Sequence, residues 1–401
     1  MKQGPENASY RWVILGTVFS LQTILSMTVF SFGPLAPFLL EALNINRAQL
    51  GLFNSLINLA VMIFGLPAGW LIDRFGVRRL LLVTGMLGVF FALFSRVDNV
   101  GTGYVLIFLA GIGYAFTGPS TSMALVHWFS PRSRATALSI KQSAVTIGSA
   151  VGAMIIPVLA TGLGWSNTTL ILGAAIMVVV VAGFLVFRDP SSRSPAPQSP
   201  ALAIFRRLLG DKRLLHLGLA CGAYGALQIS ISTYLVLQLV QVKGMPAIEA
   251  GAFLMVTNIG GAVGRIMWGS LSDRAFGGKR KTPLTIIGII SGTLAIVLSI
   301  GISGLPWGLL FFMMVILGAT AFGWNGVFMA FATEISSRDM TAAGLGWAMS
   351  LGMIGAIAGP PLFGYIVDRT TSYNPAWLIF GIVVLVAALS LILIKEHKTS
   401  L

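Results

Sequence analysis

Two cationic side chains lie inside long apolar stretches of this 401-residue chain. Lys141 falls within the stretch 135–161 and Arg265 within 247–271. An ionised side chain at the centre of an apolar helix in a bilayer costs roughly 2.5–3.5 kcal/mol, and such residues usually face a cavity. The twelve Asp and Glu residues fall in connections or at the ends of apolar stretches, and Glu334 comes nearest to an exception. A cavity that holds two cations and no acid favours a negatively charged ligand.

The two cations suit anion binding in different ways. The guanidinium of Arg265 presents a planar fork of N–H donors that matches the two oxygens of a carboxylate. Lys141 is a point charge on a flexible stem. Each residue also has a structural interpretation: Lys141 could extend its stem to the membrane interface, and Arg265 could hold carbonyls at a helix end or support the loop after Asp273.

Apolar stretches of about twenty residues recur along the whole chain, and this length crosses a bilayer as a helix. Because 56% of the residues are hydrophobic and only 9% are charged, we predict a polytopic membrane protein and not a soluble enzyme. A Pro- and Ser-rich segment, 188–213, is a predicted linker between an N-terminal six-helix bundle, 1–187, and a C-terminal one, 214–401. Prolines predict kinks in the first and eleventh spans. The twelve predicted spans are 12–40, 48–72, 79–96, 102–128, 135–161, 168–187, 214–240, 247–271, 283–303, 306–333, 341–366 and 375–394.

The distribution of Lys and Arg predicts the orientation of the chain. If the N-terminus is cytoplasmic, 20 of the 26 Lys and Arg residues fall in cytoplasmic segments and four in external loops, and the other two are Lys141 and Arg265. Positive charge accumulates on the cytoplasmic side of membrane proteins. Both termini are therefore predicted to be cytoplasmic, and the net charge of +14 is explained by the bilayer without nucleic acid.

The two halves repeat a short motif at the end of their second span. Residues 69–74 read Gly-Trp-Leu-Ile-Asp-Arg, and residues 269–274 read Gly-Ser-Leu-Ser-Asp-Arg. A second echo relates 152–157 to 355–360, which share Gly, Ala and Pro in register. Two repeated halves around a central site at the bilayer midplane are a design of secondary transporters.

The stretch 69–79 has the pattern Gly-x-x-x-Asp-Arg-x-Gly-x-Arg-Arg and resembles the signature loop of the major facilitator superfamily. The resemblance covers essentially the whole chain and implies an all-α membrane protein with twelve transmembrane helices in two pseudo-symmetric six-helix bundles. It also implies a bacterial inner-membrane protein in which this loop is a latch on the cytoplasmic side. The gating residues implied by the two copies are Gly69, Asp73, Arg74, Arg78, Gly269, Asp273 and Arg274.

The stretch 258–269 around Arg265 is similar to helix 8 of the oxalate–formate exchanger and of monocarboxylate transporters. In those families the matching Arg holds the substrate carboxylate. The chain departs from the exchanger because its eleventh span lacks the second cation, whereas its fifth span carries Lys141. Family geometry places helices 1, 4, 7 and 10 around the cavity. The predicted substrate-binding residues are Arg265, Lys141, Gln22, Asn58, Tyr224, Gln228 and Asn325.

Several activities are disfavoured by what the chain lacks. It has no Gly-x-x-x-x-Gly-Lys loop for ATP, a single cysteine, Cys221, and three scattered histidines, so no cofactor, metal centre or enzyme activity is expected. The resulting hypothesis is secondary transport of a mono- or dicarboxylate by alternating access, as proton symport or anion exchange, by a monomer. The alternatives are an inorganic anion porter of the nitrate or cyanate type and a drug or neutral-solute:proton antiporter.

Overall fold

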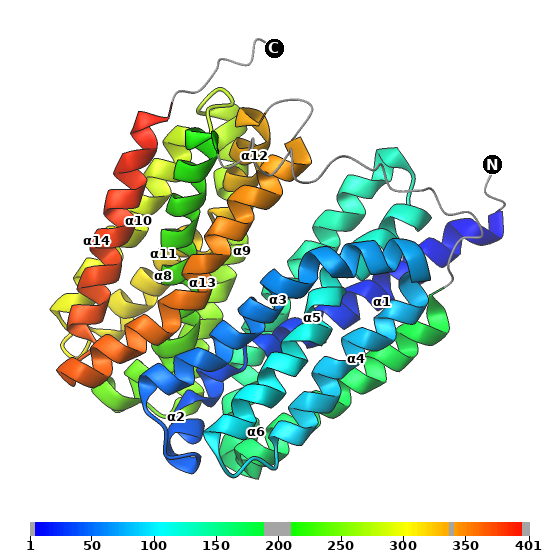
Figure 1. The fold of residues 1–401 in the computed structure, drawn as a ribbon. Coiled ribbons are helices and arrows are strands. Elements are labelled where there is room, and N and C mark those ends of the chain that lie inside the picture. The colour runs from blue at the N-terminus through cyan, green and yellow to red at the C-terminus, as the bar shows by residue number, and fades with distance from the viewer. Residues whose placement is uncertain (1–4, 188–209, 337–340, 395–401) are drawn as a thin grey trace. The chain divides into compact units, whose positions relative to one another are not determined.

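The structure is a computed structural model that describes residues 5–187, 210–336 and 341–394, and every regular element in these ranges is a helix (Figure 1). The helices before the predicted linker are α1 (Pro5–Val29), α2 (Phe32–Ala42), α3 (Arg47–Phe75), α4 (Val77–Phe94), α5 (Val100–Trp128) and α6 (Pro131–Val186). Those after it are α8 (Lys212–Lys243), α9 (Ala247–Arg274), α10 (Lys281–Ile300), α11 (Trp307–Ala321), α12 (Asn325–Ile335), α13 (Thr341–Thr370) and α14 (Asn374–Ser390), followed by the short 3₁₀ helix Leu391–Leu393.

The longest helix, α6, is two membrane spans joined at a glycine. Its backbone leaves the helical conformation at Gly164, where φ is 82° and ψ is 160°. A glycine adopts a positive φ without steric strain. The apolar part of α6 has 51 residues, which at helical rise measures about 77 Å against a hydrocarbon core of about 30 Å. When α1 is joined with α2 and α11 with α12, the described residues contain eleven helices long and apolar enough to cross a membrane. Since α6 supplies two spans, they provide twelve, as predicted.

Two of the spans are interrupted within the helix. In the first span, α1 ends at Val29 and α2 begins at Phe32, a break that lies just before the prolines that predicted a kink there. In the tenth, α11 ends at Ala321 and α12 begins at Asn325. The eleventh span contains Pro360 and Pro361, α13 continues through both as one element, and the kink expected there stays a prediction.

The chain divides into two compact units. The first contains residues 1–45 and 56–197, and the second contains 46–55 and 198–401. The first residues of α3 therefore belong to the second unit, while the rest of that helix belongs to the first. The predicted linker lies mostly outside the described residues, and the predicted bundle boundaries stay a proposal.

Glycines allow close helix packing within each unit. In the first unit α1 packs on α6, and a Cβ on Gly148 would collide with the carbonyl of Thr23. In the second unit α8 packs on α13, and a Cβ on Gly355 would collide with the carbonyl of Gly222. Between helices in a membrane, where apolar burial gives no net driving force, such close backbone contact is a main source of stability.

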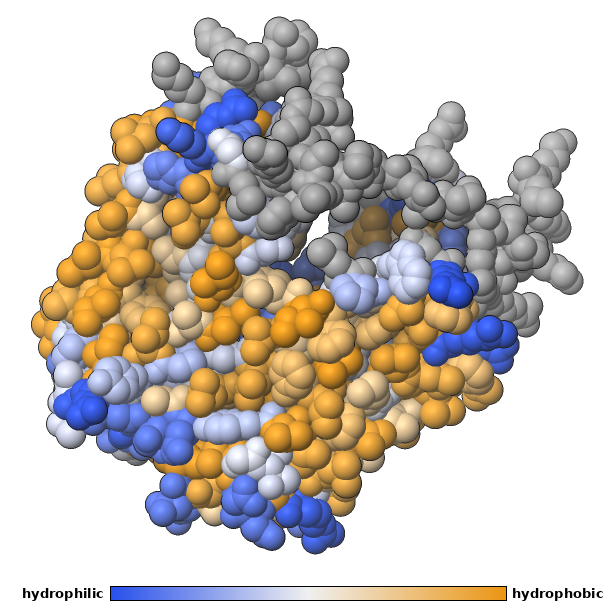
Figure 2. All heavy atoms as spheres, viewed as in Figure 1, coloured by the Kyte–Doolittle hydropathy of each residue, from blue (hydrophilic) through white to orange (hydrophobic). Residues whose placement is uncertain are grey.

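The outward faces of the helices are apolar. On α14 the exposed side chains include Leu378, Ile382, Val386 and Leu389. Figure 2 shows orange hydrophobic residues over most of the described helical surface, and blue hydrophilic residues gather near helix ends. Such a surface is unfavourable in water and suits contact with lipid.

Candidate functional site

Arg265 lies on α9, which approaches α11 closely because both helices carry glycines at their contact. A Cβ on Gly264 would collide with the backbone of Ala319, and a Cβ on Gly318 would collide with the backbone of Thr257. The absence of side chains at these positions lets the two backbones touch. Arg265 follows Gly264 directly, so its side chain emerges from the region where α9 and α11 are in contact.

The guanidinium of Arg265 contacts the break between α11 and α12. Its Nε donates a hydrogen bond of 3.1 Å to the carbonyl oxygen of Phe322, the residue after the end of α11. One turn further along α9, Trp268 Nε1 donates to the carbonyl oxygen of Ala319 at 3.0 Å. Carbonyls in the last turn of a helix lack N–H partners from the following turn. Arg265 therefore plays the helix-end role that was its structural alternative, and a guanidinium has five N–H donors with which to serve other acceptors as well.

The polar residues predicted on α8 and α12 meet at the same break. Gln228 Oε1 accepts hydrogen bonds from Trp324 Nε1 at 3.0 Å and from Asn325 Nδ2 at 3.4 Å. Gln228 and Asn325 are half-buried. The structure thus brings three of the predicted substrate-binding residues, Arg265, Gln228 and Asn325, to the segment 322–325.

Tyr224 has a different environment from the other predicted residues of α8. It is buried, and its hydroxyl donates to the carbonyl oxygen of Leu284 on α10 at 3.0 Å. Its ring packs edge-on against Trp324 with the centroids 5.9 Å apart. Tyr224 therefore contacts the polar cluster through the packing of its ring against Trp324.

In the first unit, Lys141 lies on α6 and is only 7% exposed. Its Nζ donates to the hydroxyl of Ser122 at 2.7 Å and to the carbonyl oxygen of Gly118 at 3.1 Å, both on α5. The ammonium is thus held by two neutral oxygens. Neither partner was predicted, because neutral groups leave no charge pattern in the sequence.

The remaining predicted residues of the first unit are Gln22 and Asn58. Gln22 on α1 is buried, its Nε2 donates to Ser26 Oγ at 3.4 Å, and its Oε1 has no hydrogen-bond partner among the described residues. Asn58 lies on α3 and is partly exposed. The structure does not join either of them to Lys141 by a hydrogen bond between described side chains.

The second copy of the repeated loop, which contains Asp273, takes part in an ion-pair network. The guanidinium of Arg280 contacts the carboxylates of Asp273 and Glu334 and donates to Ser272 Oγ at 2.9 Å. Desolvation lowers the pKa of Arg280, but the hydrogen bonds to the two carboxylates outweigh it and the net pKa is raised. Arg280 was missed by sequence reasoning, although it lies in the basic run 279–281. The predicted residue Arg274 is exposed at the end of α9.

The first copy of the loop has other contacts. Arg78 Nε donates to the carbonyl oxygen of Phe184 at 2.8 Å, and its guanidinium lies 4.5 Å from the centre of the Phe184 ring. Arg74 lies over the rings of Trp70 and Phe75. The side chain of Asp73 lies outside the described part of the structure.

The three glycines of the two loop copies differ in what they do. Gly76 has φ 90° where the chain turns from α3 into α4, a conformation that favours glycine. A Cβ on Gly69 or on Gly269 would meet no described atom within 4 Å. Among the described residues, no backbone therefore approaches Gly69 or Gly269 closely enough to require a glycine there.

Sequence reasoning also missed a cluster at the start of α3. Asp368 on α13 accepts hydrogen bonds from the backbone N–H groups of Arg47 and Ala48 and from the Arg47 guanidinium. Arg47 also donates to Gln241 at 2.7 Å and to Tyr373 at 3.2 Å. Burial raises the pKa of Tyr373 to about 12, against the opposing effect of its hydrogen bond with Arg47. Asp368 thus caps the N-terminus of α3 as an N-cap residue would.

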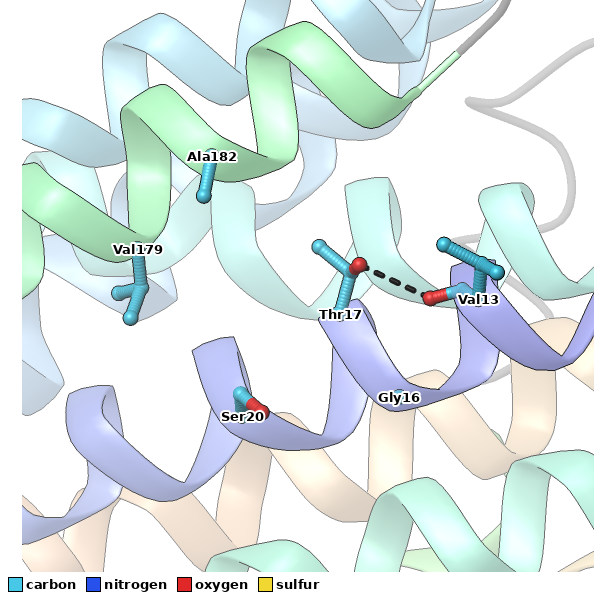
Figure 3. A pocket seen from close by; sticks show the side chains of 6 residues that line it. All are labelled: Val13, Gly16, Thr17, Ser20, Val179 and Ala182. Carbon is cyan, nitrogen blue, oxygen red and sulfur yellow. Dashed lines mark hydrogen bonds between the residues drawn. The ribbon is translucent and has the colours of Figure 1, made fainter.

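An open groove of about 350 Å³ lies between α1 and the second half of α6 (Figure 3). It is lined by Val13, Gly16, Thr17, Ser20, Val179 and Ala182, and Thr17 donates to the carbonyl oxygen of Val13 at 2.9 Å. The lining contains none of the predicted substrate-binding residues and no charged side chain. The groove therefore adds nothing to an anion site.

Comparison with known proteins places these features in a family. A model of the Major Facilitator Superfamily matches residues 18–360. The "Probable galactarate/D-glucarate transporter" of Escherichia coli is 24% identical over 98% of this chain and 94% of that protein. The "Probable sulfoacetate transporter" of Cupriavidus necator is 25% identical over 97% of this chain and 95% of that protein. The "3-(3-hydroxy-phenyl)propionate transporter" of Escherichia coli is 26% identical over 98% and 97%.

The fold is also found among solved structures. A crystal structure of the nucleoside transporter NupG superposes with a TM-score of 0.80 and covers 97% of this chain and 100% of that chain. Its sequence identity is 17%, so this likeness concerns the fold alone.

Proposed function

The chain belongs to the major facilitator superfamily, and from this we propose that it is a secondary active transporter of a small organic anion, a mono- or dicarboxylate. The observation that carries the proposal is the polar cluster at the break between α11 and α12, where Arg265, Gln228 and Asn325 are anchored within four residues. This cluster lies inside predicted membrane spans, where polar side chains are kept for substrate or ion pathways.

The named relatives support the anion class. Galactarate, glucarate, sulfoacetate and 3-(3-hydroxyphenyl)propionate differ in size and in hydroxyl content, but all carry a carboxylate. Binding sites for such a range of substrates need one residue that binds the shared carboxylate, while the residues that line the rest of the site differ from one transporter to another. Arg265 fits the receptor role because its fork of donors matches a carboxylate.

The proposed cycle is alternating access, in which the two six-helix halves rock around a site at the midplane. Arg265 binds the carboxylate, and Lys141 supplies a second positive charge from the other half. Coupling is either to a proton, with Lys141 as the candidate carrier, or to a counter-anion. The protein is proposed to be a monomeric inner-membrane transporter with both termini in the cytoplasm.

The function can be tested by uptake into proteoliposomes that contain the purified chain. Labelled galactarate, sulfoacetate and 3-(3-hydroxyphenyl)propionate are compared with nitrate and with galactitol, the uncharged six-carbon analogue of galactarate, each with and without a pH gradient. We expect uptake of at least one carboxylate. Stimulation by the gradient indicates proton symport, and stimulation by internal carboxylate alone indicates exchange.

Three results contradict the proposal. Uptake of nitrate, together with no uptake of any of the tested carboxylates, would make the chain an inorganic anion porter. Uptake of galactitol with no uptake of the acids would make it a neutral-solute transporter, and uptake of a labelled cationic drug, added to the same panel, with no uptake of the acids would make it a drug antiporter.

A further inference from the structure

The hydrogen bond between Trp324 and Gln228 settles how the Gln228 amide is turned. An indole N–H is a donor and has no acceptor atom. The atom of Gln228 that lies 3.0 Å from Trp324 Nε1 must therefore be the carbonyl oxygen, Oε1, and the amide NH₂ must point to the other side. The usual ambiguity between the oxygen and nitrogen of a glutamine side chain is absent here.

A second donor completes the arrangement. Asn325 Nδ2 lies 3.4 Å from the same Gln228 oxygen. A carbonyl oxygen has two lone pairs, so two donors use its acceptor capacity. The Nε2 of Gln228 makes no hydrogen bond to a described residue, and the only polar groups that this side chain can offer to a ligand are N–H donors.

The indole that imposes this orientation is itself held in place. Trp324 is 5% exposed. Its ring packs edge-on between Tyr224, at 5.9 Å, and Phe328, at 5.5 Å between ring centroids. Trp324 also lies in the helix break, two residues after the carbonyl that Arg265 holds. The amide of Gln228 and the guanidinium of Arg265 are thus anchored to the same short segment.

We propose that Trp324 is a positioning residue that keeps Gln228 as a donor-only group, and that this makes the site select carboxylates over neutral analogues. A carboxylate accepts hydrogen bonds from both Arg265 and the Gln228 NH₂. An amide or a polyol brings donors of its own, which find no acceptor at Gln228, and an unpaired polar group disfavours binding. This inference rests on the proposed function.

The same unit contains a matched pair that serves as control. Trp377 Nε1 donates to Gln238 Oε1 at 2.8 Å, and Gln238 also lies on α8. Trp377 is fully buried and Gln238 is 1% exposed, so no ligand can reach this amide. The substitution Trp377→Phe therefore removes the same kind of bond without affecting recognition.

The experiment measures binding of an acid and of its neutral amide to the purified full chain by calorimetry. The probes are galactarate with its diamide, and 3-(3-hydroxyphenyl)propionate with its amide. For the wild type we expect tighter binding of at least one acid than of its amide. In Trp324→Phe, which keeps an aromatic ring but lacks the N–H, the acid-to-amide affinity ratio should fall about tenfold because the Gln228 amide can then rotate. In Trp377→Phe the ratio should stay at the wild-type value while the Tm falls.

A double substitution separates positioning from a direct contact. If Trp324 acts through Gln228, then Trp324→Phe should leave the ratio unchanged in a Gln228→Met background. A further fall in that background overturns the proposal, as does a Trp324→Phe protein of near wild-type Tm with an unchanged ratio.

The outcomes also distinguish this proposal from the proposed function. A wild type that binds neither acid overturns both. A wild type that binds an acid, loses it in Arg265→Ala, and keeps its ratio in Trp324→Phe overturns only the positioning role.

Discussion

Lys141 and Arg265 are the two cations inside the spans predicted from sequence, and each donates to a backbone carbonyl of a neighbouring segment. Lys141 donates to Gly118 in α5, which is an unbroken helix from Val100 to Trp128. Arg265 donates to Phe322, which lies in a break between two helices. The chemistry of the contact is alike, but the backbone around it is different.

The difference changes what each cation contributes to the fold. A carbonyl at a helix break has lost its N–H partner and needs another donor, so Arg265 stabilises the break between α11 and α12. A carbonyl within a continuous helix already has its partner, so Gly118 gains little from Lys141. The buried charge of Lys141 is therefore the harder one to explain by structure alone, and it is the stronger reason to look for an anion in the first unit.

Substitution of Arg265 should have the largest effect. In Arg265→Ala, carboxylate transport should fall by roughly 100-fold or more, because a desolvated charge pair loses one partner. The Tm should fall too, since the Phe322 carbonyl loses its donor. Arg265→Lys keeps one charged donor for that carbonyl but lacks the fork, so transport should fall while the Tm stays near the wild type.

Uptake assays and thermal unfolding of the two variants check this prediction. Equal transport by wild type and Arg265→Ala would show that Arg265 serves only the helix break.

Removal of the Lys141 charge is expected to separate function from stability. Lys141→Met keeps an apolar stem of similar length, so transport should fall roughly tenfold or more while the Tm is unchanged or higher, because a desolvated charge is removed. The same two assays apply. If the Tm falls and transport does not, Lys141 is a structural residue like Arg265 at the break, and the contrast between them fails.

The packing that brings Arg265 to the break can be tested with a pair of glycines on α9. Gly264→Ala places a Cβ against the backbone of Ala319, and overpacking of this kind costs about 1–3 kcal/mol. Gly269→Ala meets no described atom within 4 Å and should be neutral or slightly stabilising. Thermal unfolding should give Gly264→Ala a lower Tm than both the wild type and Gly269→Ala, and equal Tm values for the two variants would contradict the described approach of α9 and α11.

The smallest effect is expected at the partner of Lys141. Ser122→Ala removes one hydrogen bond to Nζ and leaves the bond to Gly118, so the free energy of unfolding should fall by about 1 kcal/mol or less. Denaturant or thermal titration measures this, with Ser143→Ala as control, since among the described residues the Ser143 hydroxyl donates to the carbonyl of Ile140 alone. A loss of several kcal/mol would show that the ammonium depends on the hydroxyl more than the geometry indicates.

Much of the fold was predicted from the recurrence of apolar stretches along the chain. The twelve spans were predicted from stretches of bilayer length, and the split at Gly164 falls in the predicted gap between the fifth and sixth spans. Lys141 and Arg265 were identifiable because a bilayer excludes charge. These features depend on residue type alone and need no knowledge of partners.

The partners of the charged residues could not be predicted. Phe322 and Gly118 act through backbone carbonyls, which every residue has, and Gly323 in the helix break looks in sequence like the packing glycines around it. Arg47 and Asp368 lie 321 positions apart, and each was placed in a connection. Likewise, Pro361 lacks an N–H and leaves the Ile357 carbonyl open, and its donor is Ser55 Oγ, 302 positions away in the chain.

The helix α3 connects the two units because its first turns belong to one unit and the rest of it to the other. Its first turns belong to the second unit, where Asp368 and Tyr234 hold the backbone of Arg47, and from Leu56 onward it belongs to the first. Units joined only by a loose tether can swing without deforming their own helices. Here the boundary falls inside a continuous helix, so any relative motion must either bend α3 near Ser55 or detach its first turns from their partners in the second unit, among them Asp368, Tyr234 and Thr233. In the proposed alternating-access cycle, the stiffness of α3 and the strength of these contacts would therefore enter the energy barrier.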